Sequence, residues 1–129
     1  MLARSEERYQ AAKMLLDSRQ YDACVVAYYY SVLQRMMYSL NEYERRPLPY
    51  EMQNPLDESF HGKILIEIKN RIANKKYEES FEELFEALLE YRKKADYQAE
   101  SITPEECAEC RSLYDRLIWR LDRYFPVRK

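Results

Sequence analysis

Apolar residues recur at helical spacing along most of the chain. From about Leu2 to Asp17 they form a narrow stripe beneath a charged face, whereas from about Tyr21 to Leu40 they occupy almost every side. The first pattern predicts a helix packed on one face, and the second predicts a central helix with neighbours on several sides. The segment 41–57 contains three prolines. Because proline breaks helices, we expect a long irregular connection there.

Three more helices are expected after this connection. The third should begin near Asp57 or Ser59, and the fourth should run from about Tyr77 to Ala95. The fifth should begin at Thr103, because residues 103–106 read Thr-Pro-Glu-Glu, a capping box with proline at the first helical position. The apolar face of the third helix comprises His61, Ile64, Leu65, Ile68 and Ile72, and that of the fifth comprises Cys107, Cys110, Tyr114, Leu117, Ile118, Leu121 and Phe125. Residues 1–129 therefore read as one all-α domain, an antiparallel bundle of four to five helices.

A charged pair lies on the apolar face of the fourth predicted helix. Phe81, Leu84, Phe85 and Leu88 recur at i, i+3, i+4 and i+7, and Arg92 follows Leu88 by four residues. A guanidinium on a core-facing stripe needs a partner or a cleft. Asp96 lies one turn beyond Arg92 and is the candidate partner. The pair is either a structural lock between helices or part of a functional site, with Tyr97 beside it.

Composition narrows the choice of function. The single glycine argues against a sheet protein with tight turns and against glycine loops that hold phosphates. Twenty-one basic and 23 acidic residues give a net charge of −2, so contact with nucleic acid would need a local patch. The 3 cysteines lie in apolar segments, which favours a reducing cytoplasm over a disulfide framework. No apolar run has the length of a membrane span, and the charged start is unlike a signal peptide, so we expect a soluble cytoplasmic domain.

Arginines recur along one side of the last helix. Arg116, Arg120 and Arg123 are spaced by four and three residues and form a ridge that could follow a phosphate backbone. The alternative is a solvated face neutralised by Asp115 and Asp122. With Arg92 and its neighbour Lys93, the three arginines make up the candidate RNA- or nucleotide-binding residues.

Three other patterns have both a structural and a functional interpretation. Cys24, Cys107, Cys110 and His61 have the composition of a tetrahedral zinc site, but the cysteines also fit the core stripes, and we expect no metal or other cofactor. The run Tyr28–Tyr30 is explained by core packing or by a base-stacking platform. His61 is either a first-turn residue hydrogen-bonded to backbone or an imidazole that meets Arg92 across the bundle.

Five segments, in chain order, resemble prokaryotic HEPN domains. These segments are 11–16 (AAKMLL), 21–23 (YDA), 27–30 (AYYY), 60–63 (FHGK) and 89–97 (LEYRKKADY), followed by the capping box and the last helix. The segment around Arg92 is similar to the Arg-x-x-Ala-Asp-Tyr branch of the family. The resemblance covers nearly the whole chain.

The resemblance implies a helical bundle that forms a homodimer and acts with a nucleotidyltransferase or another partner protein in toxin–antitoxin or defence systems. Many members are metal-independent RNases that use an Arg and a His on one helix. This chain departs from that motif: its only histidine is His61, and residues 51–60 contain no arginine. The position after Arg92 that family RNases fill with histidine falls nearest to Asp96 or Tyr97, and an aspartate held ionised by an arginine is a poor acid.

Three functions remain open. The first is a HEPN-like protein that binds RNA or nucleotide with a partner and lacks the standard motif. The second is an active metal-independent endoribonuclease with a nonstandard catalytic set, for which Arg92, Asp96, Tyr97 and His61 are the candidates. The third is a structural or adaptor bundle whose inner face only dimerises.

Overall fold

The described part of the chain is helical. The computed structural model describes residues 2–17, 20–43, 61–72, 75–97 and 101–126. Within these residues it has five helices and no strand, namely α1 (Leu2–Asp17), α2 (Tyr21–Tyr43), α3 (His61–Asn70), α4 (Lys75–Tyr97) and α5 (Pro104–Tyr124). None of these helices is both long and apolar enough to cross a membrane. The prediction of an all-α fold is confirmed.

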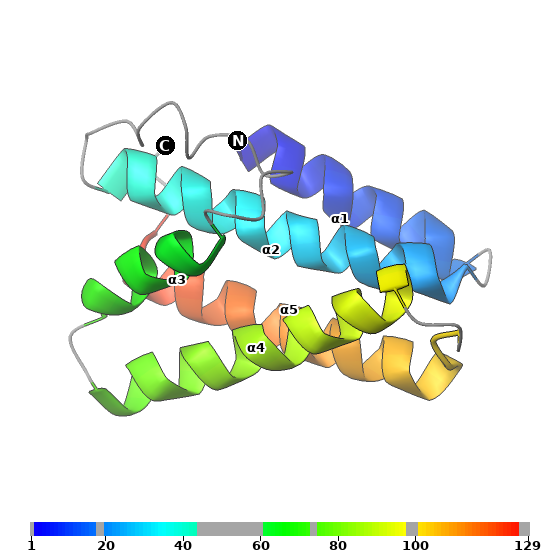
Figure 1. Cartoon of the computed structure of the whole chain (residues 1–129). Helices are drawn as coiled ribbons and strands as arrows, with labels where there is room; N and C mark the ends of the chain where they lie inside the picture. Colours follow the sequence, from blue (N-terminus) through cyan, green and yellow to red (C-terminus); the bar gives the residue numbers. More distant parts are fainter. Residues whose placement is uncertain (1, 18–19, 44–60, 73–74, 98–100, 127–129) are drawn as a thin grey trace.

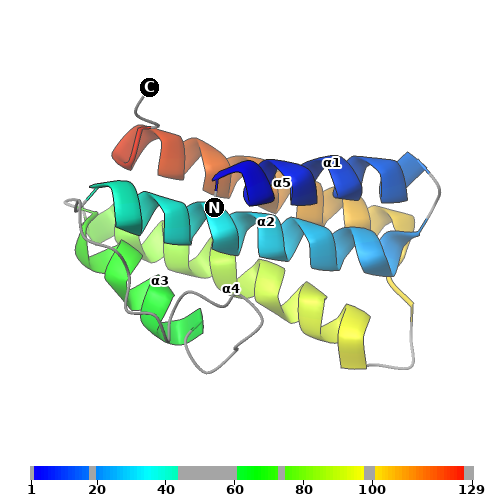
Figure 2. The ribbon, with the colours of Figure 1, turned by 90° about the horizontal axis from the view of Figure 1, so that it is seen from above.

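Helix α2 lies at the centre of the bundle. It packs against each of the other four helices, and α4 packs in addition against α3 and α5. Figure 1 shows α1 and α2 side by side above α4 and α5, and Figure 2 shows the short α3 beside one end of α2 and α4. The central position agrees with the all-round apolar pattern of this segment, and its side chains Tyr28, Leu33 and Met36 are fully buried.

Small residues bring α1 and α2 close together. Ser5 Oγ donates to the backbone carbonyl of Ser31 at 2.7 Å, and Ser31 Oγ donates to the carbonyl of Ser5 at 2.7 Å. Further along the same pair of helices, Cys24 Sγ lies 3.2 Å from the Ala12 carbonyl. A serine, an alanine or a cysteine at these positions allows a close backbone approach, because a larger side chain would separate the helices.

Helix α5 is anchored at both ends. At its start, the Thr103 side chain accepts a hydrogen bond from the Glu106 amide, and the Glu106 side chain accepts one from the Thr103 amide, both at 3.1 Å, as the sequence predicts. At its end, the buried guanidinium of Arg35 on α2 donates through Nη2 to Asp122 at 2.9 Å and to the Phe125 carbonyl at 3.1 Å. The Phe125 carbonyl is one of the acceptors that a helix end leaves without an internal partner.

Helix boundaries differ from the sequence prediction in three places. Helix α2 continues to Tyr43, so the start of the expected connection is helical, and its remainder lies outside the described residues. Helix α4 is two residues longer at each end than expected. Ile72 is buried but lies beyond the end of α3, because the amides of Arg71 and Ile72 bond to carbonyls only three residues back and so tighten and end the helix. The expected start of α3 before His61 lies outside the described residues.

Candidate functional site

Arg92 is buried, and the carboxylate that it pairs with is in part exposed. Its side chain is only 5% exposed, whereas that of Asp96 is 31% exposed. Arg92 Nε donates to Asp96 Oδ2 at 2.9 Å. The pair predicted at i, i+4 is therefore formed, with its cation in the bundle and its anion at the surface. It is neither a fully sealed lock nor an exposed pair.

Two tyrosines of α2 surround the Arg92 guanidinium. Its Cζ lies 5.3 Å from the ring centroid of Tyr29 and 5.7 Å from that of Tyr30. The two rings meet edge to face, with centroids 5.2 Å apart and planes at 82°. Aromatic faces carry partial negative charge and attract a cation. The rings therefore stabilise a positive charge that would otherwise be costly to bury.

His61 contacts the same pair of tyrosines from α3. Its Nδ1 lies 2.7 Å from the Tyr29 hydroxyl, and its ring centroid is 5.7 Å from that of Tyr29 and 6.2 Å from that of Tyr30. Burial raises the pKa of Tyr29, and the charge of Arg92 opposes this rise only in part. The phenol stays protonated and can donate to Nδ1, which in a neutral imidazole places the ring proton on Nε2.

Three helices thus bring a cation, an imidazole and a carboxylate to one place. We name Arg92, Asp96, Tyr29, Tyr30 and His61 the Arg92 centre. A fixed positive charge stabilises phosphate oxygens, and an imidazole transfers protons near neutral pH, so the set has the groups that phosphodiester chemistry uses. Sequence reasoning proposed that His61 meets Arg92 across the bundle, but it did not identify Tyr29 and Tyr30 as the residues that both of them contact.

Of the two sequence candidates next to Arg92, only the side chain of Lys93 is described, and it lies outside this centre. Lys93 is half exposed and forms an ion pair with Glu90 at 3.5 Å, so it belongs to the outer face of α4. Tyr97 is the last residue of α4, and its side chain lies outside the described part of the chain. Arg8 of α1, which the sequence did not single out, lies over the Tyr30 ring at 5.7 Å.

The predicted arginine ridge on α5 contains the only tryptophan of the chain. Arg116, Trp119, Arg120 and Arg123 follow one another at i, i+3, i+4 and i+7 and so share one face, which we name the Arg–Trp stripe. The Trp119 side chain is 55% exposed, with the Cζ atoms of Arg123 and Arg120 at 5.5 and 6.0 Å from its ring. Trp119 was missed by sequence reasoning, although its place off the apolar stripe and between arginines is visible in the sequence.

The acidic neighbours on α5 do not neutralise this stripe. Asp122 pairs with Arg35 instead, and among the ion pairs of the described residues none joins the stripe to Asp115 or Asp122. Arg120 is held by the backbone carbonyl of Arg116 at 3.2 Å and by Ser80 Oγ of α4 at 3.0 Å. The arginine ridge is thus charged and accessible, with Arg120 fixed against α4.

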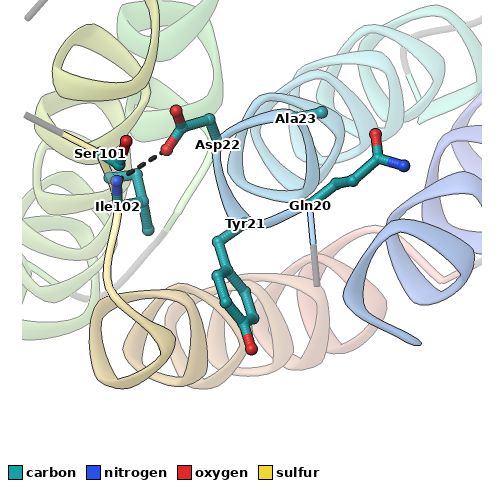
Figure 3. Close-up of a pocket in the computed structure, with 6 residues that line it drawn as sticks. All are labelled: Gln20, Tyr21, Asp22, Ala23, Ser101 and Ile102. Carbon is teal, nitrogen blue, oxygen red and sulfur yellow. Dashed lines mark hydrogen bonds between the residues drawn. The ribbon is translucent and has the colours of Figure 1, made fainter. Parts of the chain in front are cut away.

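Two cavities lie away from the Arg92 centre. One, of about 310 Å³, is formed where the start of α2 meets the segment before α5. Figure 3 shows the Asp22 carboxylate directed at the backbone of Ile102, whose amide donates to it at 2.7 Å. The other, of about 450 Å³, is a groove between α1, α2 and α5 whose lining includes Glu6, Asp115 and Asp122. The hydrogen bond between Ile102 and Asp22 gives the wall of the first cavity a structural role. The carboxylates that line the second cavity disfavour the binding of phosphates.

Two alternative sites considered from the sequence are not formed. Cys24, Cys107 and Cys110 are buried, His61 is bonded to Tyr29, and no group of three metal ligands exists among the described residues. Burial raises the pKa of Cys24 to about 12, which keeps its thiol protonated and unreactive. The run Tyr28–Tyr30 is buried, so it is not an exposed base-stacking platform.

No protein-family model matches the chain, and no curated protein or solved structure is significantly similar to it.

Proposed function

We propose that this chain is a HEPN-like protein that binds RNA or nucleotide through the Arg92 centre. It acts as a homodimer with a partner protein, such as a nucleotidyltransferase, in a toxin–antitoxin or phage-defence system of the cytoplasm. The segment around Arg92 and its order in the chain support the family. The contacts Ser5–Ser31 and Ala12–Cys24 support antiparallel packing of α1 and α2, because one partner number rises as the other falls.

The observation that carries this proposal is the convergence on Tyr29 and Tyr30. Arg92 from α4 and His61 from α3 contact the same two rings, and a pair that served only to hold α4 would not need the imidazole. Arg92 supplies the cationic group of the centre, and a guanidinium forms charge-assisted hydrogen bonds with phosphate oxygens.

A second candidate function is metal-independent RNA cleavage. The hydrogen bond between Tyr29 and His61 Nδ1 favours it, because it orients the imidazole and leaves proton transfer to Nε2. In this variant His61 supplies the imidazole that the standard Arg…His helix lacks, and Arg92 stabilises the charge that develops on the phosphate.

The binding proposal is tested with a fluorescein-labelled single-stranded RNA of about twenty nucleotides. Wild-type protein should raise its anisotropy in the micromolar range, and Arg92→Met should weaken binding at least tenfold. The matched control is Arg111→Gln, which removes an exposed charge elsewhere. Light scattering on the same samples should give twice the chain mass of 15.8 kDa. Tyr29→Phe is the second variant if Arg92→Met does not fold.

The outcomes separate the three functions. RNA bound equally well by wild type and by folded Arg92→Met contradicts a role for the Arg92 centre. Cleavage in the presence of EDTA that His61→Asn abolishes while binding persists establishes the RNase. A dimer that binds neither RNA nor nucleotide supports the third function, a structural or adaptor bundle. A monomeric mass contradicts the proposed homodimer.

A further inference from the structure

We infer that the Arg–Trp stripe of α5 binds a short stretch of single-stranded RNA, with an unpaired base stacked on Trp119 and phosphates on Arg116 and Arg123. This inference rests on the proposed RNA-binding function and assigns it a second surface on another helix. The Arg92 centre offers a buried cation, whereas the stripe offers an exposed indole with two guanidinium groups close to its ring.

The exposure and the neighbours of Trp119 carry the inference. More than half of its side chain is accessible, and two guanidinium groups lie within 6.0 Å of its ring. Single exposed apolar residues are ordinary on protein surfaces, but a tryptophan in register with three arginines combines the two elements of sequence-tolerant binding to single strands. Every base has an aromatic face to stack, and every nucleotide brings a phosphate.

The arginines of the stripe have different roles. Arg120 already donates to the Arg116 carbonyl and to Ser80, so it is a positioning residue that fixes the edge of the stripe against α4. Arg116 and Arg123 are exposed, and the structure records no ion pair for either of them. From Arg116 to Arg123 the helix rises by about 10 Å at ~1.5 Å per residue. This length matches about three stacked nucleotides at ~3.4 Å each.

Acidic surfaces border the stripe and confine a polyanion to it. Asp115 and Asp122 line the groove between α5 and α1. On the other side, Arg120 contacts Ser80 of α4, and the exposed Glu79 and Glu83 lie within one turn of Ser80 on that helix. A phosphate chain is attracted by the stripe and repelled on both sides, so it should lie along the axis of α5. Stacking on Trp119 needs an unpaired base, which favours a single strand.

The intrinsic fluorescence of Trp119 tests the inference directly, because the chain has 1 tryptophan. We expect ten-nucleotide oligoriboadenylate to quench this fluorescence with saturation, since stacking brings a base against the indole. An oligomer of the same length with abasic ribose at every position should bind more weakly and quench little. With two phosphates neutralised, log K should fall against log salt with a slope of about −1 to −2.

Four substitutions complete the test. Trp119→Leu should weaken oligonucleotide binding about tenfold, as the loss of one stacked base does. Arg116→Gln and Arg123→Gln should each reduce the salt slope by about 0.7. Arg111→Gln, on the same helix but off the stripe, should change neither the oligonucleotide affinity nor the salt slope. All four sites are exposed, and the wild-type titration decides the question even if a variant fails to fold.

The failures are distinguishable. Oligonucleotide binding that depends on Arg92 but leaves Trp119 fluorescence unchanged overturns the stripe and preserves the proposed function. Absence of any RNA binding overturns both. Trp119 quenching that increases with protein concentration in the absence of RNA would show that a second copy of the chain binds the stripe. Quenching by polyglutamate as strong as that by RNA would show that the stripe binds an acidic protein segment. Either result overturns the inference.

Discussion

At the scale of single residues, burial distinguishes Arg92 from the other cations that pair within their own helix. Arg71–Glu67 and Lys93–Glu90 have similar helical spacings, but their cations are 23% and 50% exposed. The sequence predicted the Arg92–Asp96 pair because spacing within one helix is local information. The tyrosine rings around it could not be predicted, since their position depends on how α2 packs against α4.

Arg92→Met should destabilise the protein by about 2–3 kcal/mol. The variant keeps a long side chain but loses the contact of a desolvated cation with two rings and the hydrogen bond to Asp96. Urea unfolding followed by circular dichroism measures this free energy. Lys93→Met, one residue away on the exposed face, should change it by no more than about 0.5 kcal/mol. Equal losses of unfolding free energy in the two variants would contradict a stabilising role for the buried contacts of Arg92.

At the scale of whole helices, the two ends of α5 differ in how far the sequence predicts them. The capping box is encoded within four consecutive residues, and the structure forms it as expected. The contact of Arg35 with Asp122 joins residues 87 positions apart, so no local pattern indicates it. Helices α2 and α4 end three and two residues beyond the expected Leu40 and Ala95, at helix termini, where fraying makes the boundary hard to predict.

Thr103→Ala should lower the free energy of unfolding by about 1 kcal/mol, because the Glu106 amide loses its acceptor at the first turn of α5. Thr103→Ser keeps the hydroxyl and is the matched control, with an expected change of a few tenths of a kcal/mol. Thermal and urea unfolding of the two variants should agree on this order. A serine variant as unstable as the alanine variant would mean that the threonine methyl, not the cap, is what matters.

At the scale of the whole molecule, the bundle buries several groups that must stay protonated. Burial raises the pKa of Tyr28, Tyr29 and Tyr114 above the ordinary 10.0, and of Cys24 and Cys110 above 9.0. In the unfolded chain these groups lose their protons at the ordinary values. The unfolded state therefore binds fewer protons than the folded state at alkaline pH, and the free energy of unfolding falls as pH rises.

We expect stability to be retained below about pH 8.5 and to be lost progressively as pH rises through the unfolded values toward the raised pKa values of the folded state. Melting temperatures measured by circular dichroism should be constant from about pH 7 to 8.5 and then decline. Tyrosinate absorbance should rise in two phases, first for exposed tyrosines and then, together with loss of helix, for buried ones. Complete tyrosine titration with the helices intact would contradict the burial that the fold assigns to them.

The Arg35 contact with the end of α5 has a consequence for how the bundle opens. Helix ends ordinarily fray, since their last carbonyls have no internal partner. Here the Phe125 carbonyl is held by a guanidinium that belongs to the central helix, so the final turn is released only when α2 itself moves. The amide protons of this turn should therefore exchange more slowly than those of a freely fraying helix end, and α5 should open together with α2 as one cooperative unit.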